Sequence, residues 1–260
     1  MPLKTMKNFY LFAFGIFFLL LISCESRREK KEEVKIPLTS SDSLSALLPE
    51  ISFYFYEEKN DYPDAIIEMF SPLGNQVFKP GKVPFEFNVK NFPYGEGLSG
   101  FQLKLILNSG DPVGYNMPIF QKELKEGTYR AVAYLVDQEG LMLKEFGNYV
   151  DRDFRVGDTR PFPYSAEPYI AVNLPVEGQE FTAEEELTID FLVLGGELKI
   201  DQLKVEISID DMKYEIEQVT PVRIANLPKG EHNIVIKLMY KNGKELDGPF
   251  STVRKKVIVK

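Results

Sequence analysis

The feature that most constrains the fold of this chain is an internal repeat. Pro72–Phe78 (PLGNQVF) aligns with Pro175–Phe181 (PVEGQEF), and Phe154–Val156 aligns with Val257–Val259, in both cases at an offset of 103 residues. An offset that stays nearly constant along the sequence indicates two copies of one structural unit, each about 95 residues long. We therefore expect the chain to fold as two similar domains in tandem.

Within both copies, apolar residues alternate with polar ones. The segments LKLIL and RAVAYLV of the first copy, and KVEISI and NIVIKLMY of the second, have the two-residue period of β-strands. Asn242 and Gly243 form a strong signal for a tight hairpin turn. No segment after residue 50 sustains a helical period. The pattern predicts an all-β fold, and a unit of about 100 residues with some seven short strands has the size of an immunoglobulin-like β-sandwich.

One phrase occurs in both copies and carries a family resemblance. Leu227–Ile236 (LPKGEHNIVI) and Leu124–Ala133 (LKEGTYRAVA) resemble the start of strand F in bacterial immunoglobulin-like and fibronectin type III domains. The resemblance implies two tandem immunoglobulin-like β-sandwiches. It also implies that His232 and Tyr129 are corner residues that hydrogen-bond back to the preceding turn. It covers both copies but implies no activity.

The N-terminus has the order of charge and hydrophobicity of a secretion signal. Lys4 and Lys7 precede Phe9–Ile22, an apolar run shorter than the ~20 residues that span a membrane. The segment Leu21–Cys24 (LISC) then resembles the lipobox of bacterial lipoproteins. That resemblance implies that Cys24, the only cysteine, becomes the first mature residue and carries acyl chains, such as palmitate, inserted into outer-membrane lipid.

The residues after the cysteine bear on the destination of the protein. Glu25 stands where many inner-membrane lipoproteins of Gram-negative bacteria have Asp, so the resemblance implies delivery to the outer membrane. Nearby acidic residues resemble export signals of Bacteroidota lipoproteins, but Arg27 and Arg28 depart from that pattern. The face of the membrane, periplasmic or cell-surface, stays open. Two alternatives also stay open, namely an ordinary signal peptide followed by a buried cysteine and an N-terminal membrane helix.

We expect five segments along the chain. They are a signal peptide at 1–23, a lipidated flexible tether at 24–49, a first sandwich at 50–157, a stiff proline-rich linker at 158–168 and a second sandwich at 169–260. The first sandwich is expected to include an extra strand at Ile51–Tyr56, with its tyrosines covering the outer face. Pairing of this strand with a partner chain is the functional alternative.

Charge and residue types exclude several classes of function. Beyond the signal, 29 basic residues accompany 39 acidic ones, a net charge of about −10 that disfavours nucleic acid as a partner. His232 is the only histidine, so catalytic triads and zinc sites are not expected. Acidic pairs such as Asp210 and Asp211 read as solvated turns, and a calcium ion held by Asp158 near the linker stays open. We expect no enzyme, no metal and no cofactor, with a hydrolase of unfamiliar type as the alternative.

Aromatic residues in the loops of the first copy are the candidate binding site. Two loops that share one end of an immunoglobulin-like sandwich are richer in aromatic residues than the corresponding loops of the second copy. The candidate residues for partner binding are Phe92, Tyr94, Tyr115, Phe146 and Tyr149. Aromatic side chains on rigid loops make good contact anchors. The alternative is that these rings cap the sandwich or pack on the other domain.

The sequence therefore predicts a non-enzymatic outer-membrane lipoprotein. We expect it to act as a binding or accessory subunit that contacts a protein partner in the cell envelope. The alternative is a glycan-binding accessory lipoprotein of a polysaccharide-uptake system.

Overall fold

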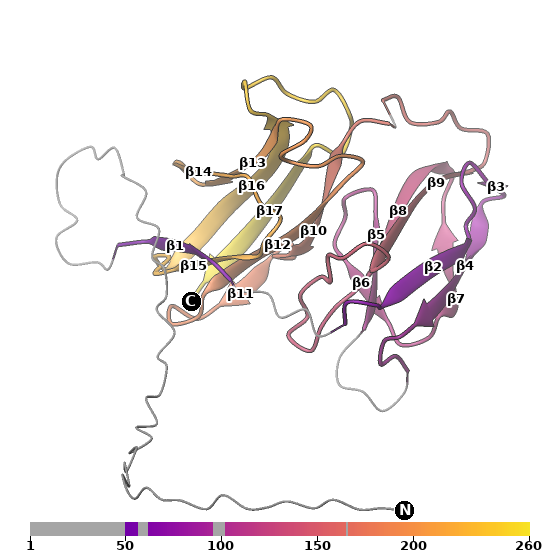
Figure 1. Ribbon diagram of the computed structural model, residues 1–260, viewed down its shortest axis with the longest axis horizontal. Helices are drawn as coiled ribbons and strands as arrows, with labels where there is room; N and C mark the ends of the chain where they lie inside the picture. Colours follow the sequence, from indigo (N-terminus) through magenta and orange to yellow (C-terminus); the bar gives the residue numbers. More distant parts are fainter. Residues whose placement is uncertain (1–49, 57–61, 96–101, 165) are drawn as a thin grey trace, which may run out of the picture. The chain divides into compact units, whose positions relative to one another are not determined.

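The computed structural model describes residues 50–260, apart from 57–61, 96–101 and 165. The predicted signal, the lipidated Cys24 and the tether lie outside the described residues. The part that is described consists of β-strands and turns and contains no helix (Figure 1). Within it, there is accordingly no helix that could cross a membrane. The predicted all-β fold is confirmed.

Strands β2 to β9 form the first sandwich. Its smaller sheet has the order β2-β4-β7 and its larger sheet the order β3-β9-β8-β5-β6. The strands are β2 Ile66–Ser71, β3 Val77–Phe78, β4 Gly81–Lys90, β5 Leu103–Leu107, β6 Val113–Tyr115, β7 Ile119–Leu124, β8 Gly127–Leu135 and β9 Tyr149–Val156. Strand β3 pairs in parallel with β9, and the other pairings are antiparallel.

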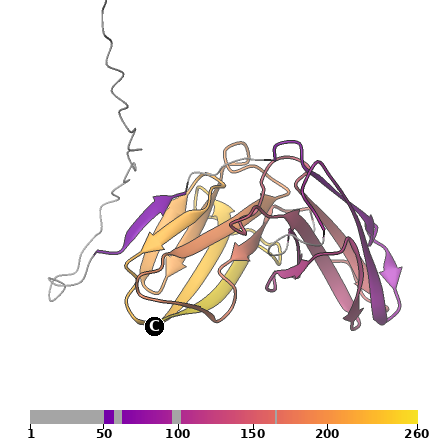
Figure 2. The same ribbon diagram turned by 90° about the horizontal axis from the view of Figure 1, so that it is seen from below.

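Strands β10 to β17, joined by β1, form the second sandwich. Its sheets have the orders β1-β15-β12-β10 and β11-β17-β16-β13-β14. The strands are β1 Ser52–Phe55, β10 Tyr169–Leu174, β11 Gln179–Phe181, β12 Leu187–Leu194, β13 Leu203–Ile209, β14 Met212–Ile216, β15 Val222–Ala225, β16 Gly230–Tyr240 and β17 Thr252–Val259. Figures 1 and 2 show the sheets from two directions.

The two sandwiches have the same topology. Apart from β1, each strand of the second sandwich occupies the position of the first-sandwich strand whose number is eight lower, so that β10 corresponds to β2 and β17 to β9. The equivalence extends to single hydrogen bonds, since the Gly157 amide donates to Phe78 O at 2.8 Å and the Lys260 amide donates to Phe181 O at the same distance. A three-strand sheet facing a five-strand sheet, with a parallel pair at one edge, is an immunoglobulin-like sandwich. The repeat is therefore a repeat of structure.

Each sandwich closes around a core of its own. In β13, for example, Leu203, Val205, Ile207 and Ile209 are buried, while the residues between them are half-buried. This period of two turns one side of the strand to the core. The inward residues of both sheets meet in one apolar cluster per sandwich.

The extra N-terminal strand belongs to the other sandwich than predicted. We assigned Ile51–Tyr56 to the first sandwich, but β1 lies beside β15 (Figure 1) and pairs with it antiparallel. In this register Phe53 lies opposite Ile224. Phe53 stacks on Tyr214 with ring centroids 4.3 Å apart, and Ile51 and Phe55 also pack against the second core. The assignment was wrong because the strand has an apolar face that extends the second core. Its neighbours in sequence do not decide its partner.

Three strands are buried on both faces. Strands β10 and β12 are almost entirely buried, and so is β8 from Arg130 onwards. Their outward residues form a third apolar cluster that contains side chains of both sandwiches. Its buried members are Ile106, Val132, Tyr134, Val136 and Met142 from the first sandwich and Tyr169, Ala171, Leu192, Leu194 and Phe250 from the second. The second sandwich is thus held to the first by a continuous core as well as by the linker.

Candidate functional site

The most exposed aromatic side chain of the described residues lies in the turn that leads into β9. This turn, Glu145–Asn148, presents Phe146 with 97% of its surface exposed. The following Gly147 has φ of 97°, a conformation that residues with a Cβ rarely adopt. The backbone of the turn therefore points the phenylalanine outward by its own geometry.

Asn148 fixes this turn to the sandwich. The residue is completely buried, its Nδ2 donates to Ala65 O at 2.7 Å, and its Oδ1 accepts from the Glu145 amide at 2.9 Å. The main chain adds a bond from the Ile67 amide to Gly147 O at 2.8 Å. Because a buried amide with its hydrogen bonds satisfied is costly to displace, the turn is held in one conformation. Phe146 is exposed and yet rigidly placed.

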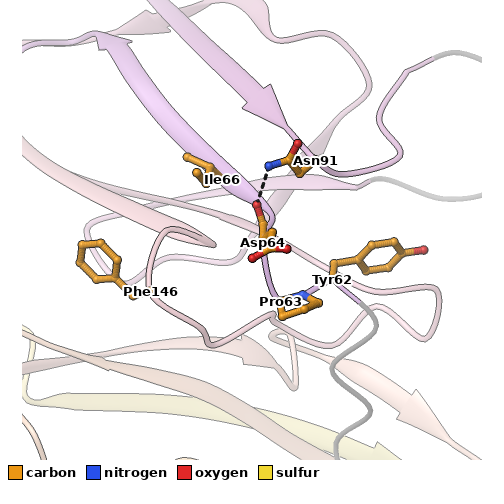
Figure 3. A pocket seen from close by; sticks show the side chains of 6 residues that line it. All are labelled: Tyr62, Pro63, Asp64, Ile66, Asn91 and Phe146. Carbon is orange, nitrogen blue, oxygen red and sulfur yellow. Dashed lines mark hydrogen bonds between the residues drawn. The ribbon is translucent and has the colours of Figure 1, made fainter.

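An open groove adjoins the exposed ring. It is lined by Tyr62, Pro63, Asp64, Ile66, Asn91 and Phe146, with a volume of about 640 Å³. We call it the Phe146 groove. Figure 3 shows Phe146 and Tyr62 on opposite sides, with Asp64 and Pro63 between them. The Asn91 side-chain amide donates to Asp64 O at 3.1 Å and joins two of the loops that build the groove.

The five aromatic residues predicted to bind a partner do not converge on one surface. Phe146 lines the groove, and Phe92 lies close to it, packed edge-on against Tyr62 with ring centroids 4.9 Å apart. Phe92 is half-buried against the first core. Tyr149 packs against the cluster shared by the two sandwiches, and burial raises the pKa of its hydroxyl.

The remaining two predicted residues close an edge of the first sandwich. Tyr115 stacks on Phe120 with ring centroids 3.5 Å apart, and the Tyr94 hydroxyl donates to Tyr115 O at 3.3 Å. Burial raises the pKa of Tyr94 to about 12. Both rings pack on the first core. Of the five candidates, Phe146 alone is fully available to a partner.

The groove also contains residues that the aromatic content of the loops did not indicate. Tyr62, Pro63, Asp64 and Ile66 precede or begin β2, and Asn91 follows β4. The repeat itself could have pointed to them. Ile67 and Ile170 lie 103 residues apart, so the segment before β2 corresponds to the segment before β10, which meets the equivalent turn of the second sandwich.

The single histidine has a structural position. His232 Nε2 lies 2.7 Å from Pro228 O, and its Nδ1 lies 2.7 Å from an Asp210 carboxylate oxygen. Tyr129, at the equivalent position, donates its hydroxyl to Lys125 O at 2.9 Å. Both residues bond to the carbonyl four positions earlier, as predicted for corner residues.

A polar cluster lies inside the contact between the sandwiches. Asp190 is completely buried and forms an ion pair of 3.0 Å with Lys144, and it accepts from the Met142 amide at 2.8 Å. Asn173 donates to the same carboxylate at 2.7 Å and accepts from the Tyr134 hydroxyl at 3.0 Å. These groups satisfy one another across the contact, so their arrangement fixes how the two sheets meet.

Among the described residues, no three His, Cys, Asp or Glu side chains gather as a metal site would require. Asp158, which we considered for calcium, is exposed.

No protein-family model matches the sequence, and no curated protein is significantly similar to it. The fibronectin(III)-like modules of Clostridium thermocellum CbhA are 12% identical, with 75% of this chain and 94% of that chain covered at a TM-score of 0.28.

Two further solved structures show comparable similarity. The three N-terminal domains of the bacteriophage RB49 Highly Immunogenic Outer Capsid protein are 11% identical, with 75% of this chain and 69% of that chain covered at a TM-score of 0.22. Bacteroides uniformis beta-glucuronidase 3 is 12% identical, with 75% of this chain and 25% of that chain covered at a TM-score of 0.25. Similarity at this level carries no argument about function.

Proposed function

We propose that this protein is a non-enzymatic outer-membrane lipoprotein that holds a protein partner of the cell envelope at the Phe146 groove. The observation that supports the proposal is the Phe146 ring, 97% exposed on a turn that a buried asparagine fixes. Large aromatic side chains in this position are the common anchors of protein interfaces.

The energetics favour a binding role for this ring. Burying a phenylalanine side chain releases about 1.5–3 kcal/mol, which is not gained while the ring lies in water. A mobile ring would lose conformational freedom on binding, but the turn at Glu145–Asn148 has already restricted its backbone. A partner that covers Phe146 therefore gains apolar burial at a small ordering cost.

The lipid anchor rests on the sequence around Cys24. We propose that acyl chains on this cysteine fix the protein to the outer membrane, since two or more chains make such anchoring stable. Metabolic labelling with an alkyne-bearing palmitate analogue tests it. Wild-type protein should take up the label and sediment with outer membranes, whereas Cys24→Ser should do neither. An unlabelled wild-type protein would contradict the anchor.

The binding role is tested by recovery of partners from gently solubilised outer membranes. We expect wild-type protein to recover a partner in stoichiometric amount and Phe146→Ser to lose it. Ile200→Ser is the matched control, because Ile200 is an apolar residue of the second sandwich with 71% of its surface exposed. Equal recovery by wild type and Phe146→Ser would reject the groove as the binding site.

A glycan is the second candidate ligand. The observation that favours it is the mixed lining of the groove, in which the polar residues Asp64 and Asn91 line the same groove as the Phe146 ring (Figure 3). Sugars are bound by such pairs of an apolar surface and polar groups. A glycan array probed with Cys24→Ser protein, with and without Phe146→Ser, separates the two candidates. Binding that disappears with Phe146 would favour the glycan, and silence across the array would favour the protein partner.

A further inference from the structure

The repeat relates the Phe146 groove to a surface of the second sandwich. Ile66 beside the groove corresponds to Tyr169, and the turn Glu145–Asn148 corresponds to 248–251. The main chain is bonded in the same way in both, from the Ile67 amide to Gly147 O at 2.8 Å and from the Ile170 amide to Phe250 O at 3.1 Å. The two surfaces are therefore built on the same backbone.

In the second sandwich this surface is occupied. The Arg130 guanidinium, which comes from the outer face of β8 in the first sandwich, lies 4.2 Å from the Tyr169 ring centroid and 5.2 Å from that of Phe250. Two bonds of 2.6 and 2.7 Å to the Asp153 carboxylate hold Arg130 in place, and only 5% of its surface is exposed. A cation on an aromatic ring is attracted by the negative face of the ring.

In the first sandwich the corresponding surface is open. Its residues differ from those that Arg130 covers, since Ile66 stands at the position of Tyr169 and Gly147 at that of Phe250. Phe146 supplies an aromatic ring, and Asp64 supplies an exposed carboxylate in the same groove. A guanidinium can stack on a ring and pair with a carboxylate at once, which an ammonium does less well because it lacks a flat face. The groove therefore suits an arginine.

We propose that the Phe146 groove binds the outer sheet face of a further β-sandwich domain, through an arginine that lies on the Phe146 ring and pairs with Asp64. The partner would lie on the same backbone surface that the first sandwich covers in the second, with the ring supplied by Phe146, one residue before the position of Phe250, and the carboxylate by the groove itself. The inference rests on the proposed function, since it names the kind of protein that the groove holds.

The partner domain belongs to a different polypeptide. A second copy of this chain has its Arg130 buried against its own second sandwich. The position equivalent to Arg130 in that second sandwich is Asn233, which carries no charge. Neither sandwich of a second copy presents the required arginine at this position.

A peptide probe tests the chemistry directly. The capped peptide acetyl-Thr-Tyr-Arg-Ala-Val-Ala-Tyr-amide reproduces residues 128–134, the segment whose arginine fills the equivalent surface. It is titrated into isotope-labelled Cys24→Ser protein, and the amide signals of the turn are followed by nuclear magnetic resonance. We expect saturable shifts of the Gly147 amide signal. Citrulline, which keeps the shape of arginine without its charge, should weaken binding about two- to fivefold.

Variants of the protein measure how much the Phe146 ring and the Asp64 carboxylate each contribute to peptide binding. Phe146→Ser should weaken the peptide about five- to tenfold, and Asp64→Asn about two- to fivefold. Lys90→Gln is the control, because Lys90 lies on the same sheet and pairs with Glu68 outside the groove. Absence of shifts at Gly147, or equal affinity for the arginine and citrulline peptides, would overturn the inference.

The experiments distinguish a failure of this inference from a failure of the proposed function. If partner recovery from membranes depends on Phe146 but the peptide does not bind, the groove binds a protein in another way and this inference alone fails. If recovery is independent of Phe146, the proposed function fails whatever the peptide does. A mapped partner segment that is helical, or that belongs to a second copy of this chain, would also overturn the inference.

Discussion

The same surface of one repeated fold is covered in the second sandwich and open in the first. In the second, Tyr169 and Phe250 are buried beneath Arg130 and contribute to a shared apolar cluster. In the first, Ile66 and Phe146 are exposed. Since the backbone is equivalent in both, the difference lies in the side chains and in the neighbour. One copy of the surface has become an internal contact, and the other is available to a partner.

One pair of equivalent carboxylates shows the same contrast between a covered and an open surface. Asp190 lies opposite Leu174 in the second sandwich, and Glu86 lies opposite Ser71 at the equivalent place in the first. Asp190 is completely buried and paired with Lys144, whereas Glu86 is exposed. A carboxylate at this position can therefore either form a buried ion pair or remain a solvated surface charge, depending on what covers it.

The largest effect is expected from removing the buried carboxylate. Asp190→Ala removes the ion pair with the half-buried Lys144 and the acceptor of the Met142 amide, which should lower the free energy of unfolding by about 3–5 kcal/mol. Glu86→Ala, at the equivalent exposed position, should change it by less than about 0.5 kcal/mol. Urea denaturation measures both. Similar losses of stability in the two variants would contradict the difference between the buried and the exposed carboxylate.

The next effect concerns the asparagine that holds the exposed turn. Asn148→Ala removes the side-chain hydrogen bonds to Ala65 O and to the Glu145 amide and should cost about 1–3 kcal/mol. Its counterpart Ser251 makes a side-chain bond of 3.2 Å to Gly248 O, so Ser251→Ala should cost less than about 1 kcal/mol. An unchanged urea midpoint in Asn148→Ala would show that this residue does not stabilise the turn.

High pH should weaken the covered contact, in addition to its effect through other tyrosines whose pKa is raised by burial, such as Tyr94. Burial raises the pKa of Tyr134 and Tyr169 in the folded protein, so the native state keeps protons that the unfolded chain releases near pH 10. Their contribution to stability is complete below about pH 10 and is lost as the pH rises beyond it. The urea midpoint should fall from about pH 10 upwards, with a smaller fall in Tyr134→Phe. A midpoint that stays constant up to about pH 11 would contradict the burial of these tyrosines.

The smallest effect on stability should come from the residue with the greatest effect on binding. Phe146→Ser removes a ring that makes almost no contact with its own sandwich, so the free energy of unfolding should change by less than about 0.5 kcal/mol. A loss above about 1 kcal/mol would show that the ring supports the fold. In that case the loss of a partner could not be attributed to the groove.

The sequence allowed the fold to be predicted because its signals are local and repeated. Strand periodicity and the constant offset predicted two all-β units, and the phrases around Tyr129 and His232 predicted the corner hydrogen bonds. The position of β1 could not be predicted in this way, because an edge strand is defined by the sheet edge that accepts it. An alternating pattern at Ile51–Tyr56 fits either sandwich equally well.

The candidate site could be predicted only in part. Aromatic residues on loops can point inward or outward, and Phe92, Tyr94 and Tyr115 are packed on the core while Phe146 is exposed. The positive φ of Gly147 and the buried Asn148 decide the direction of Phe146, and neither follows from composition. A signal for the covered contact was present in β12, whose near-continuous apolar run is typical of a strand buried on both faces.

The decisive property that we propose for the molecule is that a partner contacts the open surface of the first sandwich and not the covered surface of the second. Photo-cross-linking in intact cells tests this with p-benzoylphenylalanine placed at position 146 and, as the matched control, at Pro249, its exposed counterpart in the second sandwich. We predict one dominant cross-linked species from position 146, mapping to a β-strand of another polypeptide, and none from position 249. Equal cross-linking from both positions, or none from position 146, would contradict the account.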